Sequence, residues 1–137
     1  MMSDEARDAF LLEKRLGNLA IARDGKGPLI APIWYQYAPG GTIDICMSGS
    51  SPKASRLRAV GRASILVSGE GFPYRYVTAE GPVEIDVLGD RTFAAIESMA
   101  SRYFGPEGGR KYAEQFSADD EIMVRLTPER WHSEVLG

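Results

Sequence analysis

The sequence predicts a mainly β fold with peripheral helices, an antiparallel barrel or sandwich of at least six strands. Apolar residues alternate with polar ones in several short segments, as expected for strands with one buried face. Glycine-rich connectors at 24–27 and 39–41 are short enough to join antiparallel hairpins. Helical patterns occur only at the start, in the middle and near the end, whereas parallel strands need a crossover helix between them.

The first half of the chain is expected to hold two helices with strands between them. Ser3 can cap an opening helix that runs to Leu16, because a serine oxygen accepts hydrogen bonds from the first turn. Ser51 can cap a second helix, at 52–60, which begins with a proline and ends at a glycine. The expected strands lie at 19–21, 29–37 and 43–47.

The second half continues the alternation and adds the clearest helix. One face of a long strand carries apolar or small residues at every second position from Val77 to Ile85. Asp90 is predicted to cap a helix that stops before Gly105 and Pro106. The expected elements are strands at 63–67, 77–85 and 122–126, helices at 90–104 and 106–116, and an extended stretch through Trp131.

Composition limits the function classes. A length of 137 residues with 44% hydrophobic content predicts one domain, 1–137. The net charge of −3 argues against nucleic acid as a partner. No apolar run is long enough for a membrane span, and acids stand near the start where a signal peptide would place lysines, so we expect no membrane partner and a cytoplasmic location. One cysteine and one histidine cannot build a zinc site or a histidine-based triad, so no metal and no catalytic side chain is assigned.

A local positive patch stands out in this acidic protein. The segment 45–69 contains one lysine and three arginines and no acid. Within it, Ser48, Ser50, Ser51 and Lys53 stand at the start of the second helix, where free N–H groups and the helix dipole favour an anion. A phosphate cradle and an ordinary helix cap with solvated basic residues explain this segment equally well.

Aromatic residues follow an irregular point in the strand at 29–37. Pro32 removes a ladder donor and belongs at a sheet edge or a bulge. Trp34, Tyr35 and Tyr37 then place large rings beside that irregular backbone. A planar heterocycle could lie on such a surface, although aromatic strand residues more often belong to the core. Cys46, in an apolar strand, is interpreted as a small buried filler, and His132 as structural.

The order of these features resembles the pyridoxamine 5′-phosphate oxidase-like split β-barrel superfamily. Two later segments, Tyr76–Val83 and Arg102–Gly109, are similar to its actinobacterial flavin and deazaflavin oxidoreductase branch. The earlier segments that carry the resemblance are Leu19–Arg23, Pro32–Tyr35, Ser48–Ser51 with Lys53, Arg56–Arg58 and Arg62–Val67.

The resemblance implies a six- or seven-stranded antiparallel split β-barrel that forms a homodimer, with cofactor sites at the interface. Lys53 matches the family's phosphate-binding lysine, and the hydroxyls of Ser48, Ser50 and Ser51 are expected beside it. Several deazaflavin-binding relatives carry a basic residue at the position of Ser51. The residues expected to line the ring system are Pro32 and Ile33 with Trp34, and Trp131 is a candidate for a contribution across the interface.

The function implied is an oxidoreductase that transfers hydride to or from an unknown small molecule with FMN or the deazaflavin F420. FMN is slightly preferred, because Ser51 in place of a basic residue weakens the case for a long polyanionic tail. The cofactor carries the chemistry, which suits a site without catalytic histidines. The alternative is a noncatalytic carrier that holds the cofactor itself, a tetrapyrrole or a fatty acid in the same cleft.

The strands themselves also predict a dimer. Besides the odd-numbered inward set, the even-numbered Trp34, Cys46, Leu66 and Tyr76 form a second apolar face. One helix of about four turns covers only part of such a surface. We therefore expect an isologous two-fold interface that covers the remainder.

Overall fold

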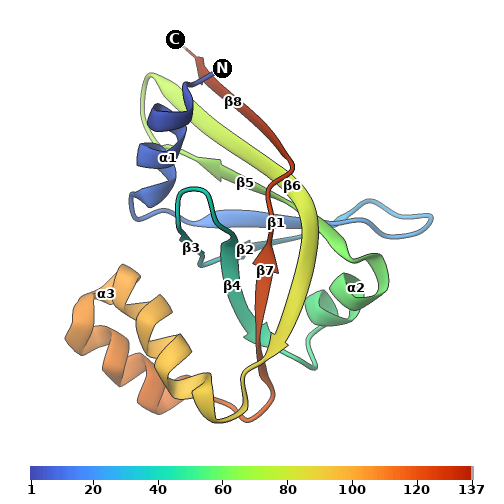
Figure 1. Cartoon of the computed structure of the whole chain (residues 1–137), viewed down its shortest axis with the longest axis vertical. Coiled ribbons are helices and arrows are strands. Elements are labelled where there is room, and N and C mark those ends of the chain that lie inside the picture. The colour runs from blue at the N-terminus through green and yellow to red at the C-terminus, as the bar shows by residue number, and fades with distance from the viewer. Residues whose placement is uncertain (137) are drawn as a thin grey trace.

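The computed structural model describes residues 1–136, and over this range it shows an antiparallel split β-barrel with three α-helices around it (Figure 1). The predicted fold class is confirmed, with eight strands in place of six or seven. The helices are α1 (Asp4–Leu12), α2 (Pro52–Val60) and α3 (Thr92–Phe116), the last preceded by the 3-10 turn η1 (Gly89–Arg91). The strands are β1 (Gly17–Ile21), β2 (Leu29–Ile33), β3 (Gln36–Tyr37), β4 (Ile43–Ser48), β5 (Arg62–Ser68), β6 (Tyr74–Val87), β7 (Glu121–Leu126) and β8 (Arg130–Leu136).

Strand β6 joins the two halves of the barrel. The strand order is β2-β1-β5-β6-β7-β4-β3, and β8 pairs with β6 beside this path. The first part of β6 pairs with β5 and β8, and its last five residues, 83–87, pair with β7. In Figure 1, β6 is the long, strongly curved strand that runs through both halves. The two halves of the barrel therefore share strand β6.

The core lies inside the curled sheet, and its members follow the predicted alternation. Odd-numbered residues of β1, β4, β5 and β6 point inward, and the N-terminal helix α1 closes the barrel with Phe10 and Leu11. Even-numbered residues of β7 complete it. The most deeply buried side chains of the sheet are Leu19, Ile21, Ile43, Ile45, Ile65, Val67, Val77, Ala79, Ile122, Val124 and Leu126.

The opening helix is shorter than predicted. It ends at Leu12, not Leu16, because its last carbonyl groups bond to side chains and not to a further helical turn. Arg15 Nε donates to the carbonyl of Phe10, and Arg102 donates to the carbonyls at 11–13. Strand β1 begins at Gly17, directly after Leu16.

Two further boundaries differ from the prediction. The single strand expected at 29–37 is broken between β2 and β3, and Pro32 lies on β2, an edge strand that pairs only with β1 in the described sheet, so the predicted irregularity is confirmed. Asp90 does not cap α3, because it lies within η1, and the helix begins at Thr92, whose hydroxyl donates to the carbonyl of Gly89 at 2.8 Å.

The predicted break at Gly105 is confirmed. Gly105 has a φ of +81°, which interrupts α3 and separates the two predicted helical pieces. The last strand is longer than predicted, because β8 continues past Trp131 to Leu136 along the outer side of β6.

Strand β6 passes very close to the link from β7 to β8 at Gly81. A Cβ atom added at Gly81 would lie 1.9 Å from the carbonyl oxygen of Thr127. On either side, Thr127 N donates to Pro82 O at 3.0 Å and Glu129 N donates to Glu80 O at 2.9 Å. Only glycine fits at this crossing.

We predict that Gly81→Ala destabilises the protein by at least about 3 kcal/mol, because the methyl group forces two backbone segments apart. Urea denaturation followed by circular dichroism measures the loss. Gly27→Ala is the matched control: a Cβ there meets nothing within 4 Å, and its effect should stay within about 0.5 kcal/mol. Equal midpoints for the two variants would contradict the proposed constraint.

Candidate functional site

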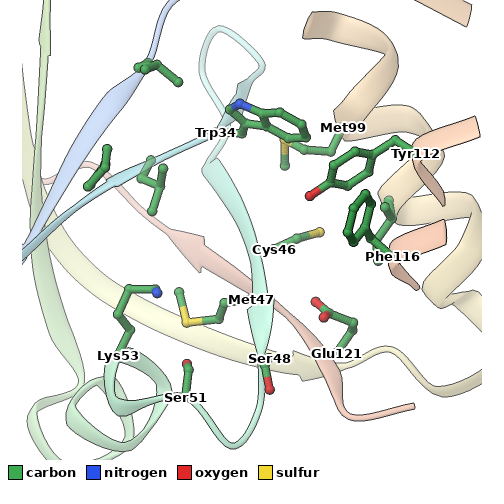
Figure 2. A pocket seen from close by; sticks show the side chains of 14 residues that line it. Trp34, Cys46, Met47, Ser48, Ser51, Lys53, Met99, Tyr112, Phe116 and Glu121 are labelled. Atoms are coloured by element: carbon green, nitrogen blue, oxygen red, sulfur yellow. The ribbon is translucent and has the colours of Figure 1, made fainter. Parts of the chain in front are cut away.

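The main pocket opens between strands β2 and β4 on one side and helix α3 on the other, and has a volume of about 540 Å³ (Figure 2). Six of the predicted site residues line it: Pro32, Ile33, Trp34, Ser48, Ser51 and Lys53. Ser50 and Trp131 are not among its lining residues. Figure 2 shows Trp34 with the side chains of α3 at one end of the pocket, and Lys53 and Ser51 at the other.

The aromatic end is built around Trp34. Its ring stacks on Tyr103 with a centroid distance of 4.9 Å and an interplanar angle of 11°. Phe104 and Tyr112 contact the same ring at 5.2 and 5.0 Å, and Phe116 follows Tyr112 at 4.7 Å. Aromatic pairs at these separations add to the energy of burial. Trp34 is therefore fixed by α3, and the rings form an apolar wall.

Arg102 and Tyr103, which precede the break at Gly105, hold helix α3 in place by hydrogen bonds. Arg102 donates to the carbonyl groups at 11–13, over 2.8 to 3.1 Å, and so satisfies the free carbonyls at the end of α1. The hydroxyl of Tyr103 donates to Arg15 O at 2.7 Å and accepts from Tyr35 N at 3.1 Å. These bonds hold α3 against α1 and the link between β2 and β3, which sets the width of the pocket.

The polar end is the start of α2. Ser51 Oγ caps the helix by accepting from Ala54 N at 3.2 Å, and Ser51 O accepts from Ser55 N at 3.1 Å. Pro52 has no N–H group. This leaves the backbone N–H of Lys53 and the hydroxyl proton of Ser51 as donors beside the ammonium group of Lys53, which forms no ion pair within the described part of the chain.

The other two predicted serines bond to a carboxylate of this chain. Ser48 Oγ and Ser50 Oγ donate to Asp120 Oδ2 at 2.6 and 2.7 Å, and Ser50 N points to the same oxygen at 3.3 Å. These bonds hold the pKa of Asp120 below its usual value. Arg58, which the sequence suggests is solvated, donates to Gly49 O at 2.7 Å. Hydrogen bonds to Asp120 and from Arg58 therefore hold the segment between β4 and α2 in place.

Trp131 lies outside the main pocket. It lines a second depression of about 460 Å³ on the outer face of β5, β6 and β8, together with His132. The guanidinium of Arg7 lies 4.1 Å above its ring, and Tyr37 contacts it edge-on at 6.0 Å. Within one chain Trp131 does not join the main pocket.

The sequence analysis did not predict several of the residues that line the main pocket. Met99, Tyr112 and Phe116 come from α3, and no motif marks which face of that helix meets the pocket. Glu121 at the start of β7 also lines it, and burial followed by the nearby charge of Asp120 raises its pKa. Cys46, interpreted as a buried filler, is only partly buried and lies on the pocket wall, where burial raises the pKa of its thiol to about 12.

Two kinds of feature are absent from residues 1–136. No group of three or more His, Cys, Asp or Glu side chains there could hold a metal ion. None of the helices in that range has the length and apolar character needed to cross a membrane.

Comparison with family models and with curated proteins finds no match to this sequence. Solved structures do match. A conserved hypothetical protein from Mycobacterium tuberculosis is 27% identical, with a TM-score of 0.81 over 98% of this chain and 86% of that one. A protein named F420 reductase is 22% identical, with a TM-score of 0.72 over 91% and 94% of the two chains.

A putative pyridoxamine 5′-phosphate oxidase from Listeria innocua is 12% identical, with a TM-score of 0.73 over 95% of this chain and 96% of that one. The matches span nearly the whole of each chain, so they concern the complete barrel and not a shared hairpin. The predicted resemblance is thus confirmed at the level of fold: this protein shares its split β-barrel with these structures, among them the putative pyridoxamine 5′-phosphate oxidase.

Proposed function

We propose that this protein is a flavin- or deazaflavin-dependent oxidoreductase that binds FMN or F420 in the main pocket and transfers hydride to or from a small molecule. The observation that carries the proposal is the composition of that pocket. Its aromatic wall at Trp34 and its cationic end at Lys53 belong to one cavity of about 540 Å³. A cofactor with a planar ring and an acidic tail needs both ends at once. One matching structure is named as an F420 reductase, which supports the same chemistry.

The residues present fit such a group. Pro32, Ile33 and Trp34 would line the ring, and Lys53 with Ser51 would hold the phosphate. When bound, the cofactor supplies the hydride transfer. The chain's own part is to orient the ring against the α3 wall and to exclude water from it. Glu121 adds a carboxyl group with a raised pKa to the same cavity, so it holds its proton to higher pH than an ordinary glutamate.

The proposed assembly is a homodimer whose sites are completed across the interface. The even-numbered apolar face predicted for the strands is incompletely covered within one chain: Leu66 is 37% exposed, and Trp34, Cys46 and Tyr76 are partly exposed. An interface over this face would bury them. Trp131 of one protomer would then reach the site of its partner. The cytoplasmic location and the single domain stay predictions.

Binding of the cofactor is the test of the function. We expect the purified protein to bind FMN or F420 with micromolar affinity or better, measured by the change in cofactor fluorescence. FMN is the slightly preferred ligand. Binding of neither cofactor at micromolar concentrations would refute the redox function. Tight binding without turnover of any acceptor would favour the noncatalytic carrier instead.

Lys53→Ala should weaken cofactor binding by roughly 1.5–3 kcal/mol, on the order of 10- to 100-fold, because one charge-assisted contact to the phosphate is lost. Lys26→Ala is the matched control, since Lys26 is an exposed lysine in the turn between β1 and β2. Arg58 does not serve as a control, because it holds the segment beside the site. Unchanged affinity in the Lys53 variant would place the phosphate elsewhere.

Light scattering coupled to gel filtration tests the dimer. We expect a mass near that of two chains at micromolar concentration, and Leu66→Glu should shift it toward one chain, because a buried unpaired carboxylate opposes association. Glu70→Lys, an exposed charge change in the loop after β5, should leave the mass unchanged. A cofactor-loaded wild-type protein with the mass of one chain would contradict both the dimer and the shared site.

A further inference from the structure

A carboxylate of this chain lies beside the polar end of the main pocket: Asp120 is exposed and does not line the pocket, but it bonds to Ser48, which does. Asp120 lies in the link between α3 and β7, and its Oδ2 atom accepts from two serine hydroxyls and from Ser50 N. The two hydroxyls are themselves 3.0 Å apart. Three donors that could serve a phosphate are thus already bonded to a carboxylate. The backbone is fixed in this arrangement as well, because Gly49 N donates to Asp120 O at 2.7 Å.

The donors left for a ligand are few. Lys53 lines the pocket and offers its ammonium group and its backbone N–H, and Ser51 offers its hydroxyl proton while its oxygen caps α2. Lys53 is the one cationic side chain that lines the cavity among residues 1–136. Arg58 lies nearby but is engaged with Gly49 O. One positive charge and a small set of donors therefore face the cavity, together with the carboxyl group of Glu121, whose pKa is raised. The ionised carboxylate of Asp120 lies beside this end of the cavity.

We infer that Asp120 makes this site selective for acidic groups with one negative charge and two free oxygens, a phosphodiester or a carboxylate, over doubly charged phosphate monoesters. A monoester presents three strong acceptor oxygens and close to two charges near neutral pH. It would leave oxygens unpaired at this set of donors and would repel Asp120. A diester leaves two free oxygens and one charge, which the ammonium group of Lys53 balances. This inference rests on the proposed function and specifies the tail of its ligand: it disfavours the phosphate monoester of FMN, and so it reverses the slight preference for FMN that Ser51 alone suggests.

A purely structural role for Asp120 gives a different result. If Asp120 only tethers the segment between β4 and α2, its loss loosens the cradle and weakens every anion alike. If it also competes for donors and repels charge, its loss favours the dianion over the monoanions. The ratio between two anions therefore separates the two roles, whereas the affinity for one anion does not.

The experiment uses small anions, so that it does not depend on the ring. The amide resonance of Lys53 in 15N-labelled protein is followed during titration with methyl phosphate, dimethyl phosphate and acetate, at low ionic strength and about pH 8, where a monoester is a dianion because its second pKa is about 6. In the wild type, dimethyl phosphate and acetate should bind at least as tightly as methyl phosphate. Asp120→Asn should raise the affinity for methyl phosphate relative to dimethyl phosphate about three- to fivefold, as expected for one exposed charge.

Asp119→Asn is the matched control: it removes the same charge at the neighbouring exposed residue, which bonds to none of the serines, and the ratio should not change. The inference is overturned if methyl phosphate binds the wild type severalfold more tightly than dimethyl phosphate, or if Asp120→Asn weakens all three anions equally. It is also overturned if no anion moves the Lys53 resonance. The order of anion affinities in the wild-type protein needs no variant. It therefore tests the inference even if Asp120→Asn does not fold.

The same titrations keep the two proposals apart. If the anions bind in the expected order but neither FMN nor F420 binds, the proposed function fails and the selectivity stands. If a cofactor binds and the anion order is reversed, the selectivity fails and the function stands.

Discussion

The crossing of the chain over Gly81 is the contact on which the arrangement of the two half-barrels depends. Because no side chain stands there, the Thr127 backbone passes directly against β6, and strand β6 can change partners from β5 and β8 to β7 within a few residues. Val83 N donates to Gly61 O at 3.0 Å, which ties the same bend to the end of α2. The bend thus fixes the angle between the halves, and the pocket lies where they meet, with Pro32 on one and Ser48 on the other.

The second wall of the pocket depends on polar bonds as well as on the packing of its aromatic rings against Trp34. Helix α3 buries few of its residues, and its position follows from Arg102 and Tyr103. Hydrogen bonds from a charged donor contribute about 1.5–3 kcal/mol each. Arg102 also lies 4.7 Å above the ring of Tyr35, while its Nε atom is buried without a hydrogen-bond partner in the described residues, which costs part of that gain.

Local patterns predicted the parts of the fold that local physics determines. Alternation located the strands, and Ser51, Pro52 and Gly61 marked both ends of α2, because caps act over three or four residues. The errors arose where a distant residue intervened. Helix α1 ends early because Arg102 satisfies its carbonyls, about 90 positions away. For the same reason the sequence analysis singled out the serines but not Asp120, which is 72 residues from Ser48 and carries no motif.

The segment between β4 and α2 therefore has two opposing requirements. Bonds from Ser48 and Ser50 to Asp120 make the cradle rigid before any ligand arrives, which lowers the entropic cost of binding. The same bonds occupy donors that a ligand would use, and they place a negative charge beside an acidic ligand. Rigidity is gained without loss of affinity only if the ligand's acidic group is small in charge and in number of oxygens. Lys53 and Ser51, which Asp120 does not bond, are the residues left to recognise it.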